Sequence, residues 1–244
     1  MNSDTKKVTV VLGIDSAMNG CGVALYFGDE PERNVSAMLP MERGQAEALV
    51  PLVKDTVARA NIEFSDIDVI VTTRGPGTFT GLRVGLSAAR SFALTLDIPL
   101  LGVSTLEALV RGYIEKQSSD INGVVAVIVE SKRSDFYFQL FDAQCRALSE
   151  ACAIDADAIV TMLSAHTGVI IGDAQLRFKA ECGDSIPDGF LLIEGEGIQP
   201  DPLTLAHIGY KAPEHGDYKD TTPLYLRGAD VSIPKSAPRK LEQQ

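Results

Sequence analysis

The stretch LGIDSAMNGCGVALY, residues 12–26, has the pattern of two β-strands joined by a tight turn. The β-branched run at residues 8–14 is typical of a strand, and residues 21–27 alternate in the manner of a second one. Asn19-Gly20 is a strong hairpin signal, because these residue types tolerate the positive φ angles that a two-residue turn requires. We therefore expect an antiparallel hairpin here, with Asp15 at the end of its first strand.

The elements around this hairpin alternate between strands and helices. Apolar residues at helical spacing indicate a helix over residues 45–60, and a second helix, rich in alanine and leucine, is expected over 79–96. The polar stretch EKQSSDING, residues 115–123, is the best candidate boundary, and the same order of elements starts again after it. The other expected strands are 34–39, 68–72, 99–103, 124–129, 136–141, 148–154, 169–172 and 190–193, and the other expected helices are 104–113, 156–164, 175–180 and 202–211.

Each half of the chain thus reads as three strands, a helix, a strand, a helix, a strand and a helix. This order predicts an α/β fold of two tandem ribonuclease-H-like lobes, the architecture of the actin-like (ASKHA) superfamily. We assign residues 1–116 to the first lobe, with a partner or dimer surface, and residues 122–231 to the second. The motif PLYLR, 223–227, is expected to add a strand, and residues 232–244 to form a disordered tail.

The composition is that of an ordinary globular protein. Of the 244 residues, 45% are hydrophobic and 23% are charged, and the longest apolar runs are too short to span a bilayer. No basic leader opens the chain, so we expect a cytoplasmic protein with no membrane association. The formal net charge of −11 argues against direct binding of nucleic acid. Lys132 and Arg133, in the motif SKRSD, are accordingly interpreted as a solvated turn.

The cysteines and histidines show no metal-binding or catalytic pattern. The four cysteines have no C-x-x-C spacing, and the three histidines form no H-x-x-x-H pair. We therefore expect reduced thiols, no metal site and no cofactor. No nucleophile, base and orienting group can be put together, so no catalytic residue is assigned.

The glycine-rich stretch RGPGTFTGLRVG, residues 74–85, has two interpretations. A phosphate-binding Walker loop requires a lysine after its last glycine, and no lysine lies between Lys54 and Lys116. The dinucleotide fingerprint fails by one position, and Pro76 removes a backbone donor. A tight turn, with Thr78 or Thr80 capping the next helix, is the simpler interpretation. Because a helix N-terminus can hold an anion, Thr78 remains a weak candidate phosphate contact.

The helix after this loop carries small residues on one side. Helical spacing places five residues on a common face, and small side chains there would let another element approach closely. These residues are Gly81, Gly85, Ala88, Ala89 and Phe92. The neighbour could belong to the same lobe or to a partner chain, and the sequence leaves both open.

Three further polar residues have local interpretations. Asp15 is a candidate metal or phosphate residue, and the simpler alternative is that it ends its strand and bonds the hairpin backbone. Ser104 and Glu107, in the motif STLE, are expected to form a capping box at the start of the following helix.

Several of these motifs together resemble the bacterial TsaB (YeaZ) family. The main match is RGPGTFTGLRVGLSAARSFALTLDIPLLGVSTLEAL, residues 74–109, and residues 12–26, SKRSDFYFQLFD at 131–142 and PLYLR are also similar. The catalytic paralogue, TsaD, shares the glycine loop but carries an H-x-x-x-H metal site on its first-lobe helix. The corresponding stretch here, MERGQAEALVPLV at 41–53, contains no histidine.

The resemblance implies an accessory subunit for the synthesis of N6-threonylcarbamoyladenosine on tRNA. It implies binding to a TsaD-type paralogue, a TsaE-type ATPase in the ternary assembly, a homodimer when alone, and contact with tRNA only through the complex. It also implies that the helices at 45–60 and 79–96 form the shared surface, and Leu49 and Val53 join the five residues above as candidate contacts. The alternative hypothesis is a nucleotide-binding phosphotransferase or ATPase of the actin-like superfamily that uses Asp15.

Overall fold

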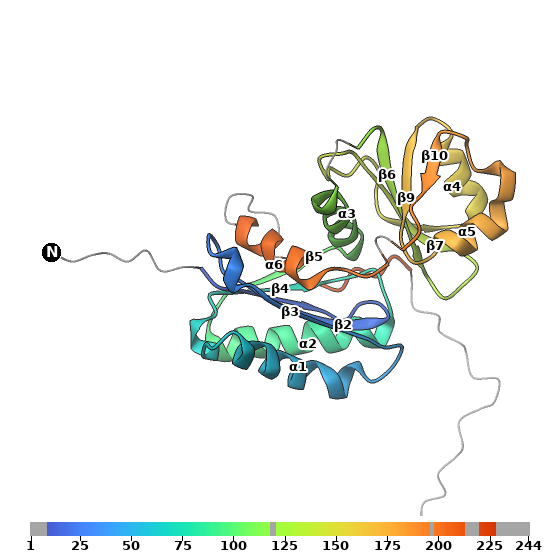
Figure 1. Ribbon diagram of the computed structural model, residues 1–244. Coiled ribbons are helices and arrows are strands. Elements are labelled where there is room, and N and C mark those ends of the chain that lie inside the picture. The colour runs from blue at the N-terminus through green and yellow to red at the C-terminus, as the bar shows by residue number, and fades with distance from the viewer. Residues whose placement is uncertain (1–8, 118–120, 196–197, 213–219, 228–244) are drawn as a thin grey trace, which may run out of the picture.

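The computed structural model describes residues 9–117, 121–195, 198–212 and 220–227 (Figure 1). The predicted tail at 232–244 lies outside these described residues. No helix among them is long and apolar enough to cross a membrane.

The first lobe is built on a five-stranded mixed sheet in the order β3-β2-β1-β4-β5. The predicted hairpin forms its centre, with Asp15 paired to Gly22 at the end of the antiparallel register. The strands β4 and β5 continue the sheet in parallel on the other side of β1. The bounds are β1 Val11–Asp15, β2 Gly20–Tyr26, β3 Val35–Pro40, β4 Val69–Thr73 and β5 Leu100–Val103.

The second lobe repeats the same topology. Its sheet has the order β10-β9-β6-β7-β8, with β6, β7 and β8 antiparallel and with β9 and β10 parallel to β6. The bounds are β6 Val124–Glu130, β7 Phe136–Phe141, β8 Cys152–Ile154, β9 Gly168–Ile171 and β10 Phe190–Leu192. The matching strand orders confirm the predicted α/β fold of two tandem ribonuclease-H-like lobes.

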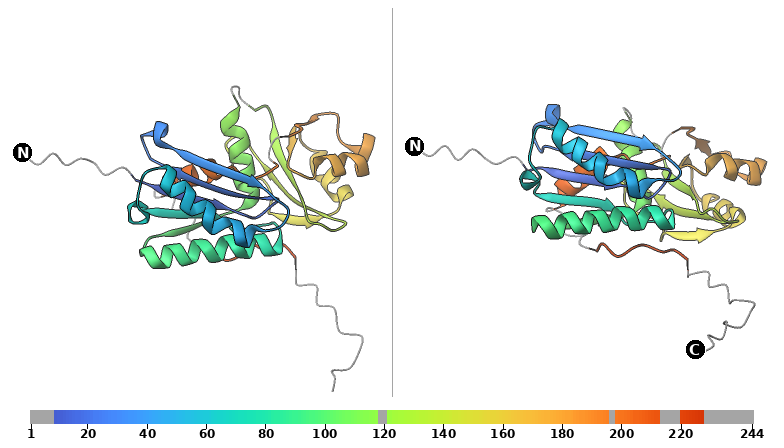
Figure 2. Two further views of the ribbon diagram at one scale, coloured as in Figure 1. Left: turned by 60° about the horizontal axis from the view of Figure 1, so that its bottom comes forward. Right: turned by 90° about the horizontal axis from the view of Figure 1, so that it is seen from below.

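Helices cover both faces of the first sheet. The helices α1 (Gln45–Arg59) and α2 (Phe79–Leu96) lie side by side on one face, as Figure 2 shows. The helix α6 (Pro202–Lys211) covers the opposite face through a cluster that includes Val11, Val71 and Leu205. Two layers of helix therefore enclose the central strands, and residues 11–15 are buried throughout.

The position of α6 changes the predicted lobe boundary. The sequence assigned residues 122–231 to the second lobe, whereas α6 packs against β1, β2 and β4 of the first. A glycine permits this contact, because a Cβ at Gly13 would collide with the carbonyl oxygen of Pro202. The chain thus returns to the first lobe after completing the second sheet.

The second sheet is also covered on both faces. The helices α4 (Ala156–Leu163) and α5 (Gln175–Cys182) pack on one face through Ile159, Leu163 and Phe178. The helix α3 (Thr105–Lys116) lies between the lobes and contacts β6 and β7. Short 3-10 turns occur at Pro31–Arg33, Phe64–Asp66 and Gly183–Ser185.

Three local predictions differ from the structure. The PLYLR segment forms no strand and runs as an extended loop, in which Leu224 donates its backbone N–H to the carbonyl oxygen of Arg74 at 2.6 Å. The strand expected over 148–154 is limited to Cys152–Ile154. The Ser104 hydroxyl makes no cap bond, and Glu107 pairs with Arg111 at 2.9 Å instead.

Candidate functional site

The glycine loop packs directly against the turn that follows β1. Thr78 donates its backbone N–H to the carbonyl oxygen of Ala17 at 2.7 Å, and the Ser16 hydroxyl donates to the carbonyl oxygen of Gly81 at 2.8 Å. A Cβ at Gly77 would collide with the carbonyl oxygen of Ala17, and one at Gly81 with that of Ser16. The glycines therefore allow two backbone segments to touch, which is the simpler of the two interpretations of this loop.

Thr78 also caps α2, as the sequence predicted. Its hydroxyl oxygen accepts the backbone N–H of Gly81 at 3.2 Å. One of the four free amides of the helix N-terminus is therefore already paired within the chain. Nothing in the structure tests Thr78 as a phosphate contact, and its hydroxyl has this structural role.

Asp15 lies in the interior of the first lobe. It is 1% exposed, and its Oδ1 accepts the Thr73 hydroxyl at 2.6 Å and the backbone N–H of Ala17 at 3.2 Å. Burial raises the pKa of Asp15 to about 6, and the two hydrogen bonds oppose that rise. The carboxylate thus bonds the residues around the hairpin, in agreement with the simpler interpretation.

The residues predicted as the partner-binding face of α2 point into the lobe. Gly81, Gly85 and Ala89 are buried, and a Cβ at Gly85 would lie 2.6 Å from the Ser16 hydroxyl oxygen. Of the two neighbours that the sequence left open, the structure shows the one in the same lobe. Ala88 and Phe92 are partly buried, and the Phe92 ring stacks on Phe64 with centroids 5.7 Å apart.

The two candidate contacts on α1 are also interior. Leu49 and Val53 are 0% exposed and belong to the core cluster of the first lobe. The face found from apolar periodicity is therefore the face that covers the sheet. The outward side of the same two helices exposes other apolar side chains, among them Val50 at 38% and Leu94 at 84%.

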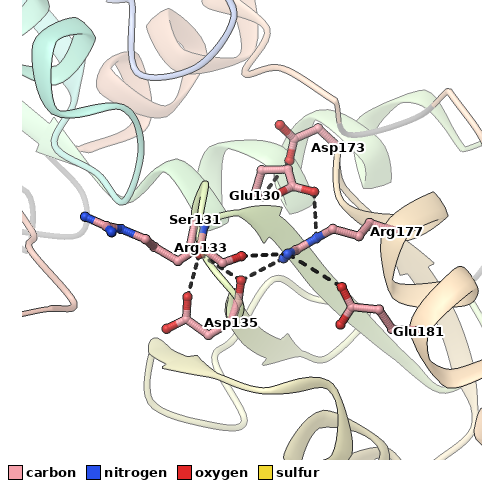
Figure 3. A network of polar contacts seen from close by, with 7 residues as sticks. All are labelled: Glu130, Ser131, Arg133, Asp135, Asp173, Arg177 and Glu181. Atoms are coloured by element: carbon pink, nitrogen blue, oxygen red, sulfur yellow. Dashed lines mark hydrogen bonds and ion pairs between the residues drawn. The ribbon is translucent and has the colours of Figure 1, made fainter.

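A polar network organises the turn between β6 and β7 in the second lobe, as Figure 3 shows. Asp135 accepts hydrogen bonds from the Ser131 hydroxyl at 2.5 Å and from Arg227 Nε at 2.7 Å. Desolvation raises the pKa of Asp135, but these hydrogen bonds and the charge of Arg227 outweigh it and leave that pKa below its ordinary value. Arg177 donates to the carbonyl oxygens of Arg133 at 2.6 Å and Asp135 at 2.7 Å, so the tip and the second half of the turn are held.

Two acidic residues support this network from the side of the sheet. Glu130 forms an ion pair with Arg177 at 2.9 Å, and Asp173 accepts the backbone N–H of Glu130 at the same distance. Burial raises the pKa of Asp173 to about 6. The SKRSD motif is therefore a braced turn with Lys132 and Arg133 at its tip.

The extended segment 220–227 connects the two lobes. Arg74 pairs with Asp220 at 3.0 Å, and Arg83 Nε donates to the Tyr225 hydroxyl at 3.2 Å. At its other end, Arg227 is bound to Asp135 of the second lobe. The segment therefore contacts both lobes. No periodicity in the sequence indicates these contacts, because the partners are far apart along the chain.

A pocket of about 620 Å³ lies between the lobes beside this segment. Three parts of the chain form its walls: the start of α2, the braced turn of the second lobe, and the segment 220–227. The lining residues are Gly77, Thr78, Phe79, Leu82, Arg83, Glu130, Ser131, Lys132, Arg133, Tyr137 and Leu224, Tyr225, Leu226 and Arg227. Thr78 is thus at this pocket, whereas Asp15 is not among its lining residues.

Comparison with known proteins assigns the chain to a family. A family model described as tRNA N6-adenosine threonylcarbamoyltransferase (TsaD) matches residues 40–181, more than half of the chain. The tRNA threonylcarbamoyladenosine biosynthesis protein TsaB of Escherichia coli is 32% identical over 130 residues, 52% of this chain and 53% of that protein. Its Bacillus subtilis counterpart is 25% identical over 226 residues, 91% of this chain and 95% of that protein. The chain belongs to the TsaB/YeaZ family.

A solved YeaZ structure shares the fold of this chain. YeaZ from Pseudomonas aeruginosa superposes with a TM-score of 0.75 and 22% identity, covering 89% of this chain and all of that one. The match to the E. coli protein spans about half of that relative's length. Within the described residues of this TsaB/YeaZ member, no group of three or more His, Cys, Asp or Glu side chains is arranged to hold a metal ion.

Proposed function

We propose that this protein is a non-catalytic accessory subunit in the synthesis of N6-threonylcarbamoyladenosine at position 37 of tRNAs that read codons beginning with A. It would act by binding a TsaD-type catalytic paralogue in the cytoplasm. The family membership supports the pathway, because relatives in E. coli and B. subtilis are named for tRNA threonylcarbamoyladenosine biosynthesis. A TsaE-type ATPase would join the assembly, the protein would form a homodimer when alone, and tRNA would be met through the complex.

The closed packing around Asp15 carries the non-catalytic part of the proposal. A catalytic carboxylate or phosphate loop has to reach its substrate, and the reacting atoms must approach to about 3 Å. Here the carboxylate is 1% exposed and bonded to Thr73 and Ala17, and the glycine loop is occupied by contacts with the turn after β1. The contacts between the glycine loop and the turn after β1 explain the glycines of this loop by packing alone.

The outward side of α1 and α2 is the proposed partner surface. These helices lie together on the outer face of the first sheet (Figure 2). Val50 on α1 and Leu94 on α2 are exposed. Burial of apolar side chains drives association between proteins, at roughly 25 cal/mol for each Å² removed from water. The buried residues Gly81, Gly85, Leu49 and Val53 would support this surface from inside rather than touch the partner.

The test is association with the TsaD-type paralogue. The two proteins, mixed at micromolar concentration, should elute together in size-exclusion chromatography. The double variant Val50→Glu with Leu94→Glu should weaken association by at least about tenfold, because a buried glutamate charge is unpaired in such an interface. Leu176→Glu is the matched control, since Leu176 is 62% exposed on α5 of the second lobe. Separate elution of the native proteins would overturn the proposed function, and an equal effect of the control would overturn the assigned surface.

A further inference from the structure

We propose that the segment 220–227 belongs to the partner surface of this protein, and that Arg83 and Tyr225 together bind a carboxylate on the partner. The partner is the TsaD-type paralogue, so this inference rests on the proposed function and deepens it. The proposed function places that partner on the outward side of α1 and α2 and gives the segment 220–227 no part in binding.

The exposed side of α2 carries a stripe of residues along the length of the helix. Exposed residues follow one another at spacings of three and four, which places them on one side of a helix. Leu94 is 84% exposed near one end of the stripe, and Phe79 is 58% exposed at the other. The stripe consists of Phe79, Arg83, Ser87, Arg90 and Leu94. The surface around Leu94 therefore continues to the first residue of α2.

The last described segment of the chain lies alongside this stripe and runs in the opposite direction to the helix (Figure 2). Arg90 Nη2 donates to the carbonyl oxygen of Thr221 at 2.8 Å, and Arg83 Nε donates to the Tyr225 hydroxyl at 3.2 Å. The Phe79 and Tyr225 ring centroids are 6.1 Å apart. Residue numbers thus rise along the segment as they fall along α2. A protein that covers the stripe would therefore meet the segment as well.

Arg83 and Tyr225 present two kinds of donor at one place. The Arg83 guanidinium lies 3.6 Å from the centroid of the Phe79 ring, so one of its faces is covered. Among the described residues, its two terminal nitrogens make no hydrogen bond. The Tyr225 hydroxyl accepts from Arg83 Nε, so its own O–H can donate to a further acceptor. A carboxylate accepts both kinds of donor and forms charge-assisted hydrogen bonds with a guanidinium.

The charge of α2 favours an acidic partner surface. The chain has a formal net charge of −11, whereas the sequence of α2 contains two arginines and no acidic residue. Asp220, the one acidic residue of the neighbouring segment, is paired with Arg74 at 3.0 Å. Complementary charges speed association and disfavour wrong partners. We therefore expect the face of the paralogue that meets Arg83 to carry an aspartate or a glutamate.

Tyr225 has the properties of an anchor for this contact. Tyrosine and arginine are enriched among the residues that dominate binding energy at interfaces, because they combine a large contact area with polar groups. Tyr225 is 47% exposed, and its contacts with Phe79 and Arg83 hold it in place. A side chain that is already ordered loses little conformational freedom on binding. These residues should therefore contribute a large share of the affinity.

The experiment is calorimetric titration of the full chain with the TsaD-type paralogue. Tyr225→Ala and Arg83→Gln should each weaken association by at least about tenfold. Tyr225→Phe keeps the ring and should weaken association less, and Arg83→Lys should retain part of it because the charge is kept. Leu191→Ala and Lys179→Gln, at exposed positions on the second lobe, are the matched controls and should leave association unchanged. Melting temperatures equal to that of the native chain would show that the variants fold.

Salt distinguishes the carboxylate contact from apolar packing. The range of charge–charge attraction falls from about 10 Å at 0.1 M to about 3 Å at 1 M ionic strength. Association of the native chain should therefore weaken between about 0.1 and 1 M NaCl, and that of Arg83→Gln should weaken less. An equal salt dependence of the two proteins would overturn the assignment of a carboxylate.

The outcomes separate this inference from the proposed function. If Val50→Glu with Leu94→Glu weakens association but Tyr225→Ala and Arg83→Gln do not, the inference is wrong and the proposed function stands. If the native proteins do not associate, the proposed function is overturned, and this inference with it. Sedimentation of the isolated chain tests a second copy as the occupant. Loss of self-association in Tyr225→Ala, with unchanged binding of the paralogue, would also overturn the inference.

Discussion

Arg227 donates from Nε to Oδ2 of Asp135 at 2.7 Å and thereby ties the last described segment of the chain to the braced turn of the second lobe. The Asp135 side chain is 12% exposed and that of Arg227 is 33% exposed. The first lobe holds the same segment through Arg74 and Arg83. This segment therefore links the two lobes, although it contributes no strand to either sheet.

Arg227→Gln should lower the free energy of unfolding by roughly 1–3 kcal/mol, because it leaves a mostly buried carboxylate without its cation. Urea denaturation at pH 7 measures this. Arg146→Gln is the matched control, since Arg146 pairs with Asp142 but its side chain is 76% exposed. That change should cost less than about 1 kcal/mol. Equal losses for the two variants would show that the contact between Arg227 and Asp135 does not stabilise the protein.

The contribution of Arg227 should also depend on pH. The pKa of Asp135 is lowered in the folded protein, so the pair stabilises the fold above the unfolded pKa of an aspartate, about 3.9. That stability is lost as the pH falls through the lower folded pKa. The difference between native protein and Arg227→Gln should therefore shrink below about pH 4. A difference that stays constant down to pH 2.5 would contradict this assignment.

Asp15→Asn should reduce the pH dependence of stability between about pH 4 and 6. The pKa of Asp15 is raised to about 6, so the folded protein holds a proton that the unfolded chain has released in this range. Stability contributed by the protonated form is present below pH 4 and is lost as the pH rises to 6. For a pKa shift of this size, the free energy of unfolding should fall by about 3 kcal/mol over this pH range.

Asp173 titrates in the same range, since burial also raises its pKa to about 6. Asp15→Asn should therefore remove one part of the slope, and the double variant with Asp173→Asn the larger part. Urea midpoints at pH 4, 5, 6 and 7.5 give the slopes. An unchanged slope in Asp15→Asn would show that this carboxyl group has an ordinary pKa.

Calorimetric titration of the native chain with Mg-ATP tests the alternative use of Asp15 as a nucleotide site, which predicts heat of binding.

Gly81→Ala should destabilise the first lobe by roughly 1–3 kcal/mol, although alanine favours helices over glycine by about 1 kcal/mol. The added Cβ would collide with the Ser16 carbonyl oxygen and lie 2.5 Å from the Thr78 hydroxyl oxygen. Gly85→Ala should cost less, because its nearest neighbour is a side-chain atom, the Ser16 Oγ, rather than a backbone oxygen, although moving that atom would strain its bond to the Gly81 carbonyl oxygen. Ser87→Ala, on the exposed side of α2, is the control. Greater stability of Gly81→Ala than of the native protein would contradict the observed packing.

Thr78 and Ser104, which precede α2 and α3, should affect stability differently when each is replaced by alanine. Thr78→Ala removes a bond to the Gly81 amide and should cost about 1 kcal/mol. Ser104→Ala should cost less than about 0.5 kcal/mol, because the Ser104 hydroxyl is buried without a hydrogen-bond partner among the described residues. Thermal or urea unfolding compares them directly. A loss in Ser104→Ala equal to that in Thr78→Ala would restore the capping box expected from the sequence.

Local patterns predicted most of the architecture. The helix expected at 79–96 has those bounds in α2, and the hairpin around Asn19-Gly20 lies at the centre of the first sheet. These predictions succeed because strand alternation and the capping of α2 by Thr78 depend on residues that are close in sequence. The two-residue turn at Asn19-Gly20 does not form, because Asp15 pairs with Gly22 and β2 already begins at Gly20. The repeated order of elements was then enough to predict two lobes with the same topology.

The predicted binding face of α2 shows what such local patterns cannot predict. Periodicity correctly grouped Gly81, Gly85 and Ala89, but it could not tell whether a sheet or a partner covers them. The same limit applies to the pocket, where Arg83, Lys132 and Tyr225 come from three distant parts of the chain. Exposed cations and aromatic residues carry no periodic signal, so their convergence was not predictable.

By itself, the sequence determined the order of the strands and helices that build the two sheets, the apolar stripe of the helix at 45–60, and the small-residue face of the helix at 79–96. Only the tertiary structure decided that this loop meets the turn after β1, that α6 returns to the first sheet, and that the segment 220–227 bridges the lobes. The physical reason is that local structure follows from neighbouring residues, whereas contacts across the molecule depend on which apolar faces and charges fit together after the sheets have formed.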